Sequence, residues 1–354
     1  LGFLNNRLNV SFDAYIRDTK DMLMAGKTLP GVYGASSPRM NVADLRTKGW
    51  EASVTWGDSF TLASKPFNYR IMAGIGDNTS KVTKYDNPNR TLTDPYEGQQ
   101  LGEIWGYVVD GYFTTDEEAR NYKVDQSFVN QMINASALDN GLHAGDLKFV
   151  DLDGNNKIEQ TTSANDRKDM KVIGNSLPRY NYNFGISADW YGIDFSVLFQ
   201  GIGKQNWYPG AETSMFWGPY SRPYASFIPS DFMSQVWSEE NTDAYFPRPR
   251  GYVALGSNRE LAVVNTKYLQ NLAYCRLKNL SIGYTLPDKW LSKIGFEKIR
   301  VYFSGENLLT FTKLHSDYID PEQASASNSW KTSKSDANIY PWAKTYSFGV
   351  DITF

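Results

Sequence analysis

Apolar and polar residues alternate along most of the chain with a period of two. In residues 180–190 and 345–354 every second residue is aromatic or aliphatic, and Asn, Ser, Thr, Gly or Asp stands between them. Because successive side chains of a β-strand point to opposite faces, this period predicts strands with one apolar and one polar face. The same alternation occurs in residues 8–16, 50–56, 67–75, 193–200, 273–286 and 299–305.

The two faces of these predicted strands differ in the charges that they hold. On the apolar faces the only charged residues are Arg276 and Lys278, near one end of their strand. A basic side chain at the middle of a lipid-facing surface costs about 2–4 kcal/mol, and the cost falls toward zero near the interfaces. We therefore expect strands that cross a membrane around a wet lumen, with Arg276 and Lys278 at or above the membrane edge. The polar faces carry Asp13, Arg17, Glu51, Arg70, Asp189, Asp194, Arg300, Glu306 and Asp351.

The connections between the predicted strands alternate between long and short. Outer-membrane barrels have short periplasmic turns and long extracellular loops, whereas a soluble sandwich has no reason to sort its loops in this way. The pattern predicts an all-β fold, a transmembrane antiparallel β-barrel with long extracellular loops; a soluble β-sheet binding protein is the alternative. The long connections are residues 18–47, 81–179, 202–272 and 311–343, and the short ones are 57–66, 191–192 and 287–298.

The number of membrane-spanning strands, odd or even, decides whether the middle of the chain crosses the membrane. Residues 100–113 resemble another strand, but counting them as spanning would leave the C-terminus on the wrong side of the membrane. We therefore expect barrel strands in 1–80, an extracellular loop subdomain in 81–179, and barrel strands with extracellular loops in 180–354. The subdomain is predicted to hold one short strand pair, a helix near 116–135 with Thr115 as N-cap, and an acidic loop.

Composition excludes several classes of function. The 354 residues carry a net charge of −3, with one cysteine and two histidines, so disulfide frameworks and histidine-based catalytic or metal sites are poorly supplied. No basic patch suggests nucleic acid, and no GxSxG, HExxH or P-loop motif suggests an enzyme. The start at Leu1, without a signal peptide, indicates a piece of a longer polypeptide, about eight strands of a larger barrel.

Six segments carry a family resemblance, and they occur in the order that the family shows. The segments are 4–8 (LNNRL), 105–111 (WGYVVDG), 146–154 (DLKFVDLDG), 276–287 (RLKNLSIGYTLP), 304–310 (SGENLLT) and 340–350 (YPWAKTYSFGV). With them, the chain resembles the SusC/RagA-type TonB-dependent transporters of the bacterial outer membrane, in their C-terminal barrel portion. The terminal Phe354 is similar to the last aromatic residue of such barrels.

The resemblance implies a 22-stranded barrel with an N-terminal plug, surrounded by membrane lipid and lipopolysaccharide. It also implies coupling to TonB through a segment outside this chain, and a SusD-like lipoprotein over the extracellular mouth. The function that follows is import of oligosaccharides, with oligopeptides as the alternative substrate and a passive barrel as the alternative outside the transporter class. Lumen charges such as Asp13, Arg70, Asp194 and Arg300 either tune the passage or, as we favour, mostly pair with one another or with the plug.

The acidic loop is a candidate site for a structural Ca²⁺ or Mg²⁺. Its spacing is similar to the first nine positions of an EF-type calcium loop, in which oxygen ligands gather on one turn. Asn156 stands where that loop has glycine, and Thr162 replaces the closing acid, a place that Asp166 is expected to take. The alternative is a turn without metal, and no organic cofactor is expected. The predicted ligands are Asp151, Asp153, Asn155, Lys157, Glu159 and Asp166.

The loop 202–230 is rich in aromatic residues among Gly and Pro. Exposed rings there would stack on sugars or anchor a partner protein. The alternative, which we favour, is that the rings pack together across the barrel mouth. The candidate ligand-binding or partner-binding residues are Trp207, Tyr208, Phe216, Trp217 and Tyr220.

Overall fold

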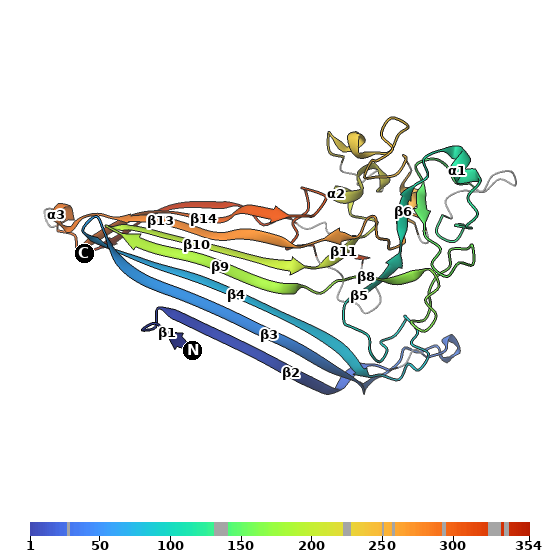
Figure 1. Ribbon diagram of the computed structural model, residues 1–354, viewed down its shortest axis with the longest axis horizontal. Coiled ribbons are helices and arrows are strands. Elements are labelled where there is room, and N and C mark those ends of the chain that lie inside the picture. Colours follow the sequence, from blue (N-terminus) through green and yellow to red (C-terminus); the bar gives the residue numbers. More distant parts are fainter. Residues whose placement is uncertain are drawn as a thin grey trace.

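A computed structural model describes residues 1–26, 29–130, 141–221, 228–249, 251–256, 259–291, 295–324, 334–335 and 340–354. Its main feature is one curved antiparallel sheet, in which long strands run side by side (Figure 1). Strand order follows the chain except where the extracellular loops intervene. The sheet consists of β1 (Gly2–Phe3), β2 (Leu8–Ala25), β3 (Arg39–Leu62), β4 (Lys65–Lys84), β9 (Arg179–Trp190), β10 (Ile193–Lys204), β13 (Tyr274–Thr285), β14 (Lys298–Thr312) and β16 (Thr345–Thr353).

The short connections lie together at one end of the sheet, and the long loops lie at the other (Figure 1). Two of the short connections are two-residue turns whose residues have positive φ, as a hairpin turn that matches strand twist requires. They are Ala63 with Ser64, and Tyr191 with Gly192. The first turn is shorter than the ten-residue connection expected, because β3 and β4 stay paired beyond their alternating segments.

The apolar face of the sheet is not covered by any part of the chain that the structure describes. Phe184, Ile186, Ile282 and Phe348 are 40%, 43%, 45% and 83% exposed, although each lies within a long strand. Exposing such a large apolar surface to water would be unfavourable, whereas contact with the hydrocarbon of a membrane is favourable. The predicted barrel fold, with one face toward lipid, is therefore confirmed in this partial barrel.

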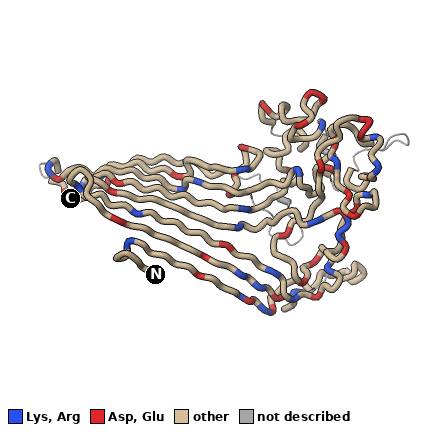
Figure 2. The backbone as a smooth tube through the Cα atoms, in the orientation of Figure 1, with Lys and Arg blue, Asp and Glu red and all other residues tan. Residues whose placement is uncertain are grey.

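The extracellular loops fold together into a unit that we call the cap: the described residues of 85–178, 205–273 and 313–324. Among the described residues, no helix is long and apolar enough to cross a membrane. Charged residues are scattered along the strands and gather more densely in the cap (Figure 2). The cap holds β5 (Glu103–Tyr107), β6 (Val109–Tyr112), α1 (Asp116–Arg120), β7 (Leu147–Phe149), β8 (Met170–Asn175), β11 (Asn206–Pro209), α2 (Ser214–Trp217), β12 (Gln270–Asn271) and the 3₁₀ helices η2 (Gly218–Tyr220), η3 (Phe232–Gln235) and η4 (Tyr252–Leu255).

Two short elements lie outside both units: η1 (Gly31–Tyr33) and α3 (Asp288–Leu291). A third, β15 (Lys334–Ser335), pairs in parallel with β11 of the cap, and β11 also pairs with β12.

Apart from one bridge between Gln100 and Lys81 of β4, residues 100–113 do not join the main sheet. Instead β5 pairs with β8 and β6 pairs with β7, so the subdomain has two short strand pairs where one was predicted. Thr115 caps α1 as expected, because its side chain accepts a hydrogen bond from the Glu118 amide. The predicted length of this helix is wrong: it ends at Arg120, and the predicted end at residue 135 lies outside the described residues.

A β-bulge corrects the assignment of Arg276 and Lys278 to the apolar face. Along β13 the register shifts between Leu277 and Asn279, so Lys278 is an extra residue without a partner across the strand pair. An extra residue reverses the in-out parity of every residue beyond it. Arg276 consequently lies opposite Gln200 and shares the lumen face with it.

Tyrosine rings lie over glycines of neighbouring strands at two places on the lumen face. Tyr15 is the direct partner of Gly49, and Tyr302 is the direct partner of Gly349. A Cβ on either glycine would collide with the ring opposite. Each ring fills space that a side chain would otherwise take, which helps to hold the strands in register.

Candidate functional site

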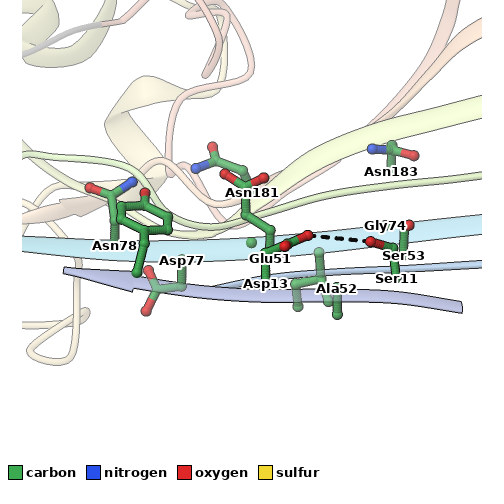
Figure 3. Close-up of a pocket in the computed structure, with 13 residues that line it drawn as sticks. Ser11, Asp13, Glu51, Ala52, Ser53, Gly74, Asp77, Asn78, Asn181 and Asn183 are labelled. Carbon is green, nitrogen blue, oxygen red and sulfur yellow. Dashed lines mark hydrogen bonds between the residues drawn. The ribbon is translucent and has the colours of Figure 1, made fainter. Parts of the chain in front are cut away.

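A polar hollow of about 360 Å³ lies on the lumen face where β2, β3, β4 and β9 run together (Figure 3). The alternation predicted from the sequence brings its residues to one face. Carboxylates, amides and hydroxyls predominate, so the surface offers both hydrogen-bond donors and acceptors. The lining includes Ser11, Asp13, Tyr15, Glu51, Ser53, Gly74, Gly76, Asn78, Asn181 and Asn183.

Two carboxylates face each other in this hollow. Asp13 and Glu51 are direct partners across β2 and β3, and the Ser11 hydroxyl donates to Asp13 Oδ2 at 3.3 Å. Within the described part of the chain, no ion pair engages either carboxylate. Like charges directly opposite on a sheet repel each other, so this pair favours a surface that receives hydroxyl, amide or basic groups.

Other lumen charges form ion pairs with one another, which is one of the arrangements expected from the sequence. Arg300 donates to both oxygens of Asp194, at 2.8 and 2.6 Å, and to Asp351 at 3.3 Å. The guanidinium and the Asp194 carboxylate meet above Gly283, where an added Cβ would lie 2.6 Å from both side chains. Glycine at this position therefore leaves room for the ion pair.

The acidic loop brings three carboxylates together. Ligand oxygens of Asp151, Asp153 and Asp169 all lie within 4.8 Å of one another. Asp169 is fully buried and accepts hydrogen bonds from the amides of Leu152 and Glu159, at 2.8 and 2.7 Å. Burial raises the pKa of its carboxyl above the usual range. Clustered carboxylate oxygens of this kind fit a hard cation such as Ca²⁺.

The structure does not bring Asp166 into this cluster; Asp169, three residues further along, joins it instead, and the role of Asp166 as a ligand stays a prediction. Asp166 is 69% exposed at its side chain and lies 3.9 Å from Lys168. Asn156 has φ +62°, so it takes the left-handed backbone expected where the calcium loop has glycine.

The other predicted ligands bond within the loop. The Asn155 side-chain amide donates to the carboxylates of Asp153 and Glu159, at 3.2 and 3.0 Å. The Lys157 backbone N–H donates to Asn155 Oδ1 at 2.8 Å. The bound metal itself stays a prediction.

The five candidate aromatic residues of loop 202–230 lie in the centre of the cap. Their exposed fractions are 2% or less. Their polar atoms are bonded inside the protein: the Tyr220 hydroxyl donates to the Pro247 carbonyl at 2.7 Å, and Trp217 Nε1 donates to the Gly210 carbonyl at 3.0 Å. The expectation of exposed stacking rings is wrong, and the packing alternative fits. A binding role stays a prediction and would require the core to open. The five are Trp207, Tyr208, Phe216, Trp217 and Tyr220.

Several side-chain contacts of the cap were not predicted from the sequence. His315 stacks on Tyr245, with ring centroids 3.5 Å apart, and its Nε2 lies 2.8 Å from Gln235 Oε1. Burial lowers the pKa of His315. Asp320 and Glu322 contact Arg276 from 44 and 46 residues away. Such separations leave no signal in a local sequence pattern.

No protein-family model matches the chain. It is 27% identical over 373 residues to TonB-dependent receptor P3 of Formosa agariphila, and 23% identical over 359 residues to TonB-dependent receptor SusC of Bacteroides thetaiotaomicron. Both matches cover 100% of the chain, with 33% and 31% of the relative. The chain is thus similar over its whole length to TonB-dependent receptors, SusC among them. It therefore spans about a third of the length of these relatives.

Solved structures agree on the fold. The RagAB peptide importer in its "open-open" state matches 100% of the chain and 33% of its own chain, with a TM-score of 0.69 at 21% identity. A structure of the RagAB peptide transporter matches with a TM-score of 0.67 at 20% identity. The resemblance to SusC/RagA-type receptors is thus confirmed, and the sheet is part of an outer-membrane β-barrel.

Proposed function

We propose that this chain forms the lumen wall and part of the extracellular mouth of a TonB-dependent importer of oligosaccharides. The observation that carries the proposal is the polar hollow on the lumen face (Figure 3). Sugars present many hydroxyl groups, each a donor and an acceptor, and the amides of Asn181 and Asn183 with the carboxylates of Asp13 and Glu51 supply matching partners. The chain acts as a conduit and not as an enzyme.

The whole importer needs parts outside this chain. We propose that the remaining strands close the barrel, that a plug blocks it, and that TonB supplies energy through a segment of that plug. A SusD-like lipoprotein is proposed to cover the cap. The family relationship supports these partners, since the relatives include SusC and the similar structures include RagAB.

Oligopeptides are the second candidate substrate. One observation favours them: the opposed Asp13 and Glu51 carboxylates suit lysine or arginine side chains. The solved structures of the similar fold belong to a peptide importer.

Uptake assays separate these possibilities. Cells that carry the full-length protein are given labelled oligosaccharides or labelled peptides, with and without functional TonB. TonB-dependent uptake of oligosaccharides alone is the expected result. Uptake of peptides alone would move the proposal to the second candidate, and uptake that persists without TonB would indicate a passive barrel. Recovery of chemically unchanged sugar inside the cell checks that no reaction accompanies passage.

A further inference from the structure

A strap of the cap crosses the inner side of the sheet at its extracellular end. We use "strap" for residues 313–324, which follow β14 directly. The strap contacts Arg276, and Arg276 lies on the lumen face because the bulge at Lys278 reverses the parity of β13. The strap therefore lies on the side of the sheet that faces the passage.

Arg276 is bonded through all three of its guanidinium nitrogens. Nη2 donates to Asp320 Oδ1 at 2.5 Å, Nη1 donates to Glu322 Oε2 at 2.6 Å, and Nε donates to Thr310 Oγ1 at 2.9 Å. The side chains of Arg276 and Asp320 are each only 3% exposed. Such a planar fork fixes direction as well as distance, so the strap is held in one position.

Lys278 completes the network and balances its charge. Its Nζ donates to both oxygens of Glu322 at 2.8 Å, and it lies 5.6 Å from the ring centroid of Trp342. Asp320 Oδ2 accepts from the Trp342 amide at 3.0 Å, which ties the far end of the same loop to the strap. Two basic and two acidic side chains therefore form one neutral, largely buried group.

The opposite side of the strap belongs to the core of the cap. Leu314 and Ile319 are buried in the aromatic cluster, and the Ser316 hydroxyl donates to the Met215 carbonyl at 2.7 Å. The strap thus joins the sheet to the cap, and the charge network is its attachment to the sheet.

A buried network of this kind acts as a unit. Removal of one member leaves the remaining charges desolvated without compensation, which is far less favourable than the complete set. The attachment is therefore expected to be either closed or fully released, with few intermediate states.

We propose that Arg276, Lys278, Asp320 and Glu322 form a latch that holds the strap over the lumen face of the barrel mouth, so that release of the latch widens the passage. The widening rests on the proposed transport function; the attachment of the strap does not.

Hydrogen exchange tests the attachment in the full-length protein. In Arg276→Met, which keeps the apolar stem and removes the fork, amide exchange in residues 313–324 should rise at least tenfold while that of β10 stays unchanged. The matched control is Arg46→Met, which breaks the exposed 2.7 Å pair with Asp18 on the same sheet and should leave the strap unaffected. Unchanged exchange in the strap of folded Arg276→Met would overturn the latch.

A milder variant covers the case in which Arg276→Met fails to assemble. Glu322→Gln keeps the shape of the side chain and removes one charge of the network. It should raise exchange in the strap severalfold, and equal exchange in Glu322→Gln and wild type would also overturn the latch.

Labelling of a lumen cysteine tests the widening. Ser304 lies on the lumen face of β14, opposite Ser281 and Ser347, and is deeper in the barrel than the latch. With Cys275 replaced by Ser, Ser304→Cys should react with an externally added PEG-maleimide several times faster when Arg276→Met is also present. Faster exchange in the strap without faster labelling would overturn the widening. Wild-type protein that shows no TonB-dependent uptake would refute the proposed function, whatever the strap does.

Discussion

The sheet and the cap place the same kinds of side chain in opposite ways. Phe184 of the sheet is 40% exposed, whereas Phe216 of the cap is 2% exposed. In the sheet, aromatic and aliphatic residues cover the outer face; in the cap they form a core around Trp217 and Phe246. Both arrangements put apolar groups in apolar surroundings, which are lipid for the sheet and protein for the cap. The surroundings of each region, lipid or protein, therefore decide whether its apolar side chains lie on an outer face or in a core.

The largest expected effect is a cavity in the cap. Trp217→Ala removes a fully buried ring and should lower the free energy of unfolding of the cap by about 3–5 kcal/mol. Trp290→Ala, at a 61% exposed site in α3, should change it by less than about 0.5 kcal/mol. Denaturation of the full-length protein in detergent, followed by near-ultraviolet circular dichroism, measures both. Equal effects of the two variants would contradict the burial of Trp217 in the core of the cap.

A charge on the lipid face is next in size. Ile186 lies midway along the apolar face of β9, so Ile186→Arg should cost about 2–4 kcal/mol of folding free energy in lipid vesicles. Ser196→Arg, on the lumen face of the neighbouring strand, should cost little. Reversible urea unfolding in vesicles measures the two. If Ser196→Arg proved the more damaging variant, the assignment of the faces would be inverted.

Calcium should stabilise the cap and leave the sheet unaffected. At 100 times its dissociation constant, a bound ion adds about 2.7 kcal/mol. Asp153→Asn should abolish the gain and Asp166→Asn should keep it, because Asp153 lies in the carboxylate cluster and Asp166 does not. Thermal unfolding with Ca²⁺, with Mg²⁺ and with chelator measures the effect. Loss of the gain in Asp166→Asn would restore the ligand set predicted from sequence spacing.

The smallest effect concerns the lumen ion pair. Gly283→Ala should displace Arg300 from Asp194, and since both side chains are partly exposed, the loss should stay below about 1 kcal/mol. Gly57→Ala is the control, because an added Cβ there meets no atom closer than 3.8 Å. Urea unfolding in vesicles compares the two variants. A larger loss in Gly57→Ala would show that glycine content, and not the ion pair, matters.

Much of the sheet follows from the sequence because the period of two is a local property. Residues 180–190 and 345–354 show their faces without knowledge of the fold, and the alternation of loop lengths orients the barrel. The bulge at Lys278 was missed, since an extra residue in one strand is defined only by its neighbours. The error reversed the face assigned to Arg276.

The cap was less predictable because its contacts join distant residues. Trp217 contacts the ring of Tyr268, and Arg276 donates a hydrogen bond to Asp320. Each pair is far apart in the sequence, and the length of a loop does not reveal which residues it brings together. In the acidic loop, spacing pointed to Asp166 and missed Asp169, which lies only three residues further along and joins the carboxylate cluster because of the way the chain folds back.

The tyrosines that cover Gly49 and Gly349 have a consequence for how the barrel is assembled. A strand that joined its neighbour one residue out of step would present a side chain where Tyr15 or Tyr302 needs empty space. Misaligned pairings of these strands are thus disfavoured by steric conflict within the sheet itself, without any contribution from the loops. Contacts within the sheet therefore favour the native strand register.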